Sequence, residues 1–146
     1  MIIFITFLIT LILDQATKYL VDNYFVLGQS LPIIKNIFHL TYVQNRGAAF
    51  GILQGKSNFF IVVTVVAIGL IIYFYKDLPL DNWFNSLALG LVLAGIIGNL
   101  IDRVRLGYVV DFFDFRIWPV FNIADSAIVV AAFIMGYWIL FLDESS

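Results

Sequence analysis

Four long apolar stretches constrain the fold of this 146-residue chain more than any other feature of its sequence. They cover about residues 2–21, 59–75, 83–101 and 122–142. A helix needs roughly 20 predominantly apolar residues to cross the hydrocarbon core of a bilayer. Only 12% of the residues are charged, against about 25% in a typical soluble domain. The sequence therefore predicts an integral membrane protein with four transmembrane helices.

The segments between the predicted spans differ in length. Residues 76–82 form a short turn, whereas residues 22–58 and 102–121 are longer and lie on the opposite side if all four helices cross. The β-branched and aromatic residues of segment 37–43 favour a strand. We therefore expect a single domain, 1–146, of the all-α membrane class: a four-transmembrane-helix bundle with a small β-sheet on one membrane surface.

The composition excludes several classes of function. The formal net charge is −2, so nothing indicates a nucleic-acid partner. The chain has no cysteine, which excludes disulfides, thiolate nucleophiles and sulfur-ligated metals. His39 is the only histidine, so we expect no histidine-built zinc site, no other metal and no cofactor.

Ionisable and polar side chains lie inside or at the end of the first and third predicted spans. An ionised group at the centre of a membrane helix costs at least about 2.5–3.5 kcal/mol, so each needs a reason. Asp14 and Lys18 are four residues apart and share a helix face. They form either a simple ion pair or a pair that also orients polar groups in a cavity. Asn99 and Asp102 share a face of the third span, where Asp102 and Arg103 could instead anchor the span end.

Small residues recur every four positions in the third span, at Gly90, Ala94 and Gly98. This spacing lets a neighbouring helix approach closely. We interpret the ladder as helix packing.

Two further carboxylates lie in apolar surroundings. Asp111 interrupts an apolar run in the second long loop, and Asp125 stands at the start of the fourth span, three residues after Asn122. Taken singly, Asp125 could be a helix cap and Asp111 a loop residue. They can converge, however, because they are fourteen positions apart, and a loop of that length easily folds back. Asp114 also lies between phenylalanines, but we expect it to take no part in such a pair.

A converging pair of carboxylates has a definite chemistry. Two carboxylates close together in a poorly hydrated pocket cannot both ionise, so one holds a proton that the other lacks. Such a pair can remove a proton from water and donate one to a carbonyl oxygen and then to a leaving amine. This is the chemistry of an aspartic peptidase, and it needs no metal, cysteine or histidine.

The polar residues fall into five short motifs that resemble, in order, those of lipoprotein signal peptidase, the signal peptidase II family of intramembrane aspartic peptidases. The matching segments cover nearly the whole chain and are Asp14-Gln15-x-x-Lys18, Asn45-x-Gly47-Ala48-Ala49-Phe50, Gly98-Asn99-x-x-Asp102-Arg103, Val110-Asp111-Phe112 and Phe121-Asn122-x-Ala124-Asp125. The resemblance implies that Asp111 and Asp125 form the catalytic pair. It also implies that further residues bind substrate or support that pair: Asp14, Lys18, Asn45, Gly47, Asn99, Asp102, Arg103 and Asn122.

The resemblance also implies a substrate and a location. The substrate would be a prolipoprotein carrying diacylglycerol on a cysteine, cleaved just before that cysteine, with membrane lipids as surroundings. The enzyme would lie in the bacterial cytoplasmic (inner) membrane as a multi-pass protein, with both termini cytoplasmic and the active site near the extracytoplasmic face. Segment 45–51 could clamp the substrate backbone. Because the site needs one chain, we expect a monomer.

The charge distribution disagrees with this orientation. Of the eight Lys and Arg residues, only Lys76 lies on the side of the termini, so the positive-inside rule would place the termini outside. We follow the family because the other cations have acidic neighbours or would face lipid headgroups.

Two alternative functions remain open at this point. One is a small proton- or ion-coupled carrier, since intramembrane charges also mark translocation paths. The other is a non-catalytic protein that packs against a partner through the small-residue ladder.

Overall fold

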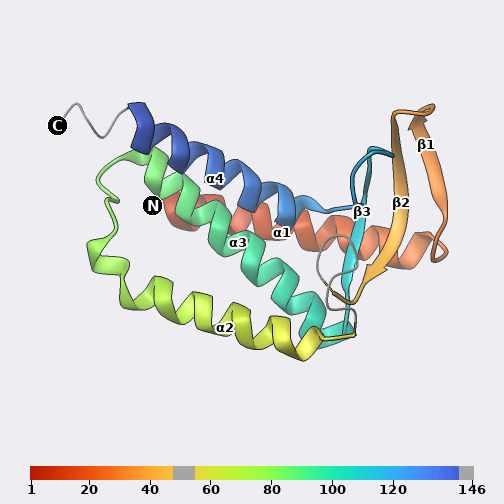
Figure 1. The fold of residues 1–146 in the computed structure, drawn as a ribbon, viewed down its shortest axis with the longest axis horizontal. Helices are drawn as coiled ribbons and strands as arrows, with labels where there is room; N and C mark the ends of the chain where they lie inside the picture. The colour runs from red at the N-terminus through yellow and green to blue at the C-terminus, as the bar shows by residue number, and fades with distance from the viewer. Residues whose placement is uncertain (48–54, 142–146) are drawn as a thin grey trace.

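The computed structural model describes residues 1–47 and 55–141. Within these residues the chain forms four α-helices and a three-stranded antiparallel sheet. The helices run along the long axis of the molecule, and the sheet covers one end of the bundle, called here the sheet end (Figure 1). The start of α1 and the end of α4 both lie at the other end. The predicted combination of a helical bundle and a small sheet is confirmed.

The helix bounds lie within a few residues of the predicted spans. They are α1 (Ile2–Tyr24), α2 (Ser57–Tyr73), α3 (Trp83–Leu106) and α4 (Ile123–Phe141), with a short 3-10 helix, η2 (Tyr75–Asp77), after α2. Of the described helices, α1, α3 and α4 are long and apolar enough to cross a membrane. With 17 residues, α2 is shorter, although it is mainly apolar and contains no charged residue. The last predicted residue of the fourth span, Leu142, lies outside the described residues.

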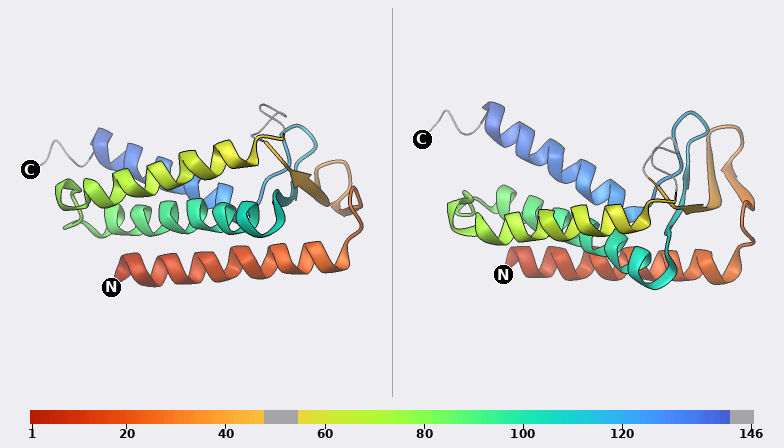
Figure 2. Two further views of the ribbon diagram at one scale, coloured as in Figure 1. Left: turned by 90° about the horizontal axis from the view of Figure 1, so that it is seen from below. Right: turned by 60° about the horizontal axis from the view of Figure 1, so that its bottom comes forward.

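The central helix is α3, which packs against each of the other three. Figure 2 shows α2 lying along α3. Small residues let α1 and α4 approach the α3 backbone closely. A Cβ atom added to Gly90 would lie 2.8 Å from a backbone oxygen of α1, and one added to Gly95 would lie 2.5 Å from the carbonyl oxygen of Ala124 in α4. The predicted packing role of the ladder is confirmed at Gly90, and Gly95 adds a contact that the ladder did not include.

Residues suited to helix ends limit α3 on both sides. The side chain of Asn82 accepts a hydrogen bond from the backbone N of Phe84 at 2.9 Å, as N-cap residues do. Gly107 ends the helix with a left-handed φ of 79°, a conformation that favours glycine. This ending sends the chain directly into β3, so β3 starts beside the last turn of α3.

The sheet has the order β1 (Ser30–Ile34), β2 (Phe38–Asn45) and β3 (Val109–Asp114). β2 corresponds to the strand predicted at 37–43, whereas no strand was predicted at β1 or β3. In the pairing of β2 with β3, Val43 lies opposite Asp111 and Asn45 opposite Val109. Because side chains alternate between the two faces of a sheet, this register places Asn45 and Asp111 on the same face.

The other face of β3 forms a small apolar core with the end of α1. Val110 and Phe112 are buried in it together with Val21 and Tyr42. This alternation explains the direction of Asp111, which lies between the two core residues and faces away from them.

Candidate active site

Asp111 and Asp125 meet at the sheet end although they belong to different elements. Asp111, in β3, is only 1% exposed, and Asp125 is half-buried in the first turn of α4. The buried Asn122 links them. Its Nδ2 donates to Oδ1 of Asp111 at 2.7 Å, and its Oδ1 accepts from the backbone N of Asp125 at 2.9 Å. The structure thus brings together the two carboxylates that were predicted to converge.

The chain between the two aspartates folds back by strand-like pairing. Phe113 and Phe121 form an antiparallel bridge with hydrogen bonds of 2.8 and 3.1 Å between their backbones. In the turn, Arg116 adopts a left-handed φ of 68°, and its backbone N donates to Oδ1 of Asp114 at 2.8 Å. This turn returns the chain to β3 just before α4 begins.

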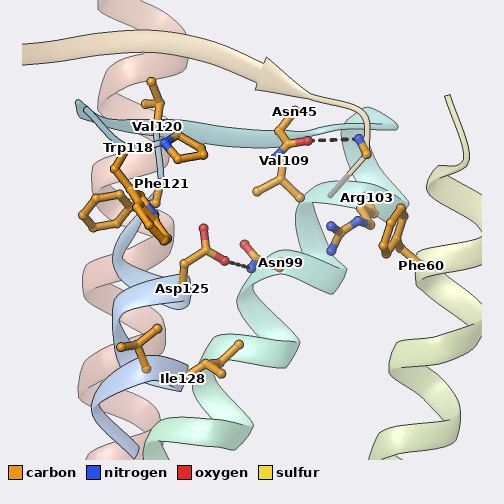
Figure 3. Close-up of a pocket in the computed structure, with 13 residues that line it drawn as sticks. Asn45, Phe60, Asn99, Arg103, Val109, Trp118, Val120, Phe121, Asp125 and Ile128 are labelled. Carbon is orange, nitrogen blue, oxygen red and sulfur yellow. Dashed lines mark hydrogen bonds between the residues drawn. The ribbon is translucent and has the colours of Figure 1, made fainter. Parts of the chain in front are cut away.

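Asparagine amides hold oxygens of both carboxylates. Nδ2 of Asn45 donates to Oδ2 of Asp111 at 3.0 Å. Nδ2 of Asn99 donates to Oδ1 of Asp125 at 2.8 Å (Figure 3). The backbone N of Gly47 donates to Oδ1 of Asn45 at 3.0 Å, which leaves the amino group of that amide for Asp111. These amides fix the two carboxyl groups without adding a charge to the site.

The surroundings of Asp111 favour its protonated form. Burial is the largest cause, and the negative charge of Asp125 adds to it. The hydrogen bonds from Asn45 and Asn122 act in the opposite direction but are outweighed. The net effect of these contributions is to raise the pKa of Asp111 to about 7. Asp111 can therefore carry a proton near neutral pH beside a second carboxylate.

A buried ionic cluster lies next to this pair. Nζ of Lys18 is 3.0 Å from Asp14 Oδ2 and 2.9 Å from Asp102 Oδ2. It also donates to Oδ1 of Asn99 at 2.9 Å. The pair of Asp14 and Lys18 is thus present, but it is more than an ion pair within one helix. Gln15 completes the cluster by donating to Oδ1 of Asp102 at 3.1 Å.

Asp125 and Asn99 face a cavity of about 350 Å³ (Figure 3). The guanidinium group of Arg103 also lines it and lies 5.0 Å from the ring centre of Phe60. The cavity therefore combines amide, carboxylate and guanidinium groups with apolar walls. Its lining residues are Asn45, Gly47, Phe60, Asn99, Arg103, Val109, Trp118, Pro119, Val120, Phe121, Asp125, Ile128 and Val129.

A second cavity, of about 520 Å³, adjoins the first at Asp125. Both cavities are also lined by Trp118, Phe121 and Val129. The remaining lining of the second is mainly apolar and consists of Phe115, Ile117, Ser126 and Val130. Asp125 thus stands where a polar cavity meets an apolar one.

Comparison with known proteins identifies the family. The family model for signal peptidase (SPase) II matches residues 6–141. The chain belongs to the signal peptidase II family. Its described helices agree with a multi-pass membrane protein.

Relatives in this family match almost the whole chain. The lipoprotein signal peptidase of Halothermothrix orenii is 56% identical over 131 residues, which cover 89% of each chain. That of Clostridioides difficile is 48% identical over 147 residues and 99% of each chain. A solved structure described as a bacterial membrane enzyme is 36% identical, with a TM-score of 0.87 over 98% of this chain and 89% of the other.

Of the residues predicted for the site, Asp111 and Asp125 form the carboxylate pair and Asn122 joins them. The others lie in the ionic cluster or in the wall of the first cavity. Three residues of the second motif, Ala48, Ala49 and Phe50, lie outside the described residues, as does most of the predicted substrate clamp. Gln15 belonged to a matching motif but was not predicted for the site. Phe60 carried no signal, because a phenylalanine in an apolar helix is indistinguishable by sequence from one that faces lipid.

Asp114 lies apart from the pair, as predicted. It follows Val110 and Phe112 in the alternation of β3 and so belongs to the face opposite Asp111. Its Oδ2 accepts from Thr41 at 2.7 Å and pairs with Arg116 at 2.8 Å. Burial opposes ionisation, but these hydrogen bonds outweigh it and lower the pKa of Asp114. Among residues 1–47 and 55–141, no group of three or more His, Cys, Asp or Glu is placed to hold a metal ion.

Proposed function

We propose that this chain is an intramembrane aspartic endopeptidase that removes the signal peptide from diacylglyceryl-modified prolipoproteins by cleaving just before the lipidated cysteine. Membership of the signal peptidase II family supports a prolipoprotein substrate. The observation that carries the catalytic assignment is the pairing of Asp111 and Asp125 through Asn122 beside a cavity. The family match gives no support to the alternative of an ion-coupled carrier.

The two aspartates have different roles in this mechanism. Asp125 lines the cavity and is the base. Asp111 is buried, has a raised pKa and is the acid. Asp125 removes a proton from water as the water oxygen attacks the scissile carbonyl carbon, while Asp111 donates its proton to the carbonyl oxygen. When the C–N bond breaks, Asp125 gives its proton to the leaving amine, and Asp111 recovers one from the hydroxyl of the intermediate.

The two cavities suit different parts of such a substrate. The first holds the peptide around the scissile bond, where Arg103 and the asparagine amides can donate to its carbonyl oxygens. The second holds apolar substrate groups, because its walls are mainly apolar side chains. Asp125 borders both cavities, which places the base at the junction of the peptide and its apolar part.

The membrane placement is part of the proposal. We place α2 as a fourth span, because 17 residues at about 1.5 Å each reach about 26 Å, close to the hydrocarbon thickness of about 30 Å, and because none of them is buried in the bundle. The sheet end faces the extracytoplasmic side of the bacterial cytoplasmic membrane, and both termini are cytoplasmic. The protein acts as a monomer and a single domain.

Cleavage of a defined substrate tests the function. Purified protein in detergent micelles is incubated with a diacylglyceryl-modified prolipoprotein and, separately, with its unlipidated form. Wild type, Asp111→Asn, Asp125→Asn and the control Asp114→Asn are compared by gel shift. We expect wild type and Asp114→Asn to cleave only the lipidated form. Each of the other two variants should lose at least about a thousandfold in rate, because it removes one member of the acid–base pair.

Two outcomes would contradict the proposal. If folded wild type cleaves neither form, the proposed reaction is wrong. If Asp111→Asn or Asp125→Asn cleaves at the wild-type rate, the assignment of the catalytic pair is wrong.

A further inference from the structure

We propose that Lys18 and the two carboxylates that it binds form one positioning unit, which sets the placement of Asp111 and Asp125 by holding the backbone N–H just before each of them. The inference rests on the proposed function, because it assigns a role relative to that catalytic pair. The unit consists of Asp14, Lys18 and Asp102.

Each carboxylate of the unit accepts a hydrogen bond from the backbone N of the residue that precedes one of the two catalytic aspartates. Oδ1 of Asp14 accepts from the N of Ala124, the residue before Asp125, at 2.9 Å. Oδ2 of Asp102 accepts from the N of Val110, the residue before Asp111, at 3.1 Å. The two carboxylates therefore hold the start of α4 and the start of β3 in the same way. A shift of either would displace the catalytic side chain that follows.

One lysine binds both of these carboxylates. Its ammonium group has three N–H donors, and all three have acceptors, on Asp14, Asp102 and Asn99. Lys18 is only 3% exposed, so water does not substitute for these partners. Without the ammonium group, the carboxylates of Asp14 and Asp102 would be buried without a cation, a costly arrangement.

The third bond of Lys18 extends the unit to Asp125 itself. Since Oδ1 of Asn99 accepts from Lys18 at 2.9 Å, the amide is oriented with Nδ2 toward Asp125, to which it donates at 2.8 Å. Oδ1 of Asn99 also accepts from Nδ2 of Asn122 at 3.2 Å. The same asparagine side chain thus joins the ionic cluster to the amide that links both aspartates.

A plain ion pair that helps α1 enter the membrane would need none of these contacts. Such a pair could be formed by Asp14 and Lys18 alone, within one helix. Instead the unit connects α1 to α3, β3 and α4, the elements that carry the site. Lys18, Asp14 and Asp102 are therefore positioning residues rather than catalytic ones.

Variants of the unit distinguish positioning from general stability. In Asp102→Asn, the side-chain oxygen can still accept from Lys18 and Val110, whereas Asp102→Ala removes that acceptor. We expect Asp102→Asn to keep kcat within about tenfold of wild type. We expect Asp102→Ala and Lys18→Met each to lose about a hundredfold, the scale of a displacement of about 1 Å in a catalytic group. The kcat of each is measured on the lipidated substrate after size exclusion and thermal unfolding have shown that it is folded.

The pH dependence of kcat is a second measurement, and a mere loss of stability would not shift it. Charges surround Asp111 from three elements: Asp125 on α4, Lys18 on α1, and Asp102 and Arg103 on α3. Because the Lys18 cation lowers the pKa of Asp111, Lys18→Met should move the alkaline limb of kcat to higher pH. Asp102→Asn removes an anion and should move the limb to lower pH. The two charge changes therefore predict opposite shifts.

The outcomes separate this inference from the proposed function. Wild-type kcat and an unmoved limb in Lys18→Met, or limbs that move in the same direction in both variants, would overturn the positioning unit. If Lys18→Met does not fold, equal kcat values for Asp102→Asn and Asp102→Ala overturn it. Asp111→Asn is run alongside as a reference for the reaction. If that variant cleaves normally, the proposed catalytic pair fails, whatever the other variants show.

Discussion

At the scale of single residues, the site depends on a difference between two identical side chains. Asp111 is enclosed by the sheet and receives amide hydrogen bonds on both oxygens. Asp125 borders two cavities and has access to substrate and water. The buried carboxylate is the one that favours protonation, and the accessible one is the one that can act on water. In the mechanism that we propose, this difference in burial gives the roles of acid and base to residues that are chemically alike.

This difference predicts the pH dependence of cleavage. The proposed mechanism needs the proton on Asp111, whose pKa is raised to about 7. As pH rises through about 7, Asp111 loses that proton and kcat should fall, approaching a tenfold decrease per pH unit well above the pKa. Initial rates at saturating lipidated substrate from pH 5 to 9 would test this. A rate that stays constant up to pH 9 would contradict the role of Asp111 as the acid.

At the scale of elements, the helices could be predicted from sequence more completely than the sheet. An apolar run of membrane length has few alternatives, and the helix bounds follow it closely. The strands carry weaker signals. β1 contains Pro32, which argues against a strand but is tolerated at a sheet edge. In β3, acidic residues break the apolar run, and its strand conformation depends on pairing with β2, which is distant in sequence.

The same reasoning explains which site residues could be predicted. Asp14, Lys18, Asn99 and Asp102 are polar residues in apolar helices, so each needed an explanation before any contact was known. Their partners across helices could not be read from the sequence, because they depend on how α1 and α4 approach α3. The cavities depend on the same packing. Their apolar lining residues, such as Phe60, resemble every other apolar residue in the spans.

Helix packing leads to a prediction at Gly98. A Cβ atom at this position would lie 2.5 Å from Oδ2 of Asp14, and that carboxylate is held by Lys18 and Ala124. Gly98→Ala should therefore destabilise the protein by about 1–3 kcal/mol, as overpacking does, and lower kcat by displacing Asp14. Thermal unfolding in detergent and cleavage of the lipidated substrate measure the two effects.

Gly69→Ala is the matched control for Gly98→Ala. Gly69 also lies within a helix, but a Cβ atom there would meet nothing within 4 Å. Because alanine has the higher helix propensity, this variant should be at least as stable as wild type and equally active. Wild-type stability and activity in Gly98→Ala would show that the close approach of Asp14 to α3 is not required.

At the scale of the whole molecule, the distribution of charge explains why a count of cations is a weak guide to the orientation that we propose. Lys18 is buried between two carboxylates, and Arg116 pairs with Asp114. Arg103 lines the cavity that also contains Asp125. These cations make contacts within the sheet end or line the site. They are therefore poor indicators of which side of the membrane that end occupies.

The orientation and the fourth span can be tested by labelling single cysteines. The chain has no cysteine, so each variant carries one thiol and wild type is the blank. Ile33 is 53% exposed in β1 at the sheet end, and Asp77 is exposed in η2 beyond the other end of α2. In intact cells, a membrane-impermeant maleimide should label Ile33→Cys but reach Asp77→Cys only after permeabilisation. Labelling of both in intact cells would contradict the crossing of α2. The reverse pattern would place the sheet end in the cytoplasm, as the positive-inside rule predicts, and would separate the site from substrates on the extracytoplasmic face.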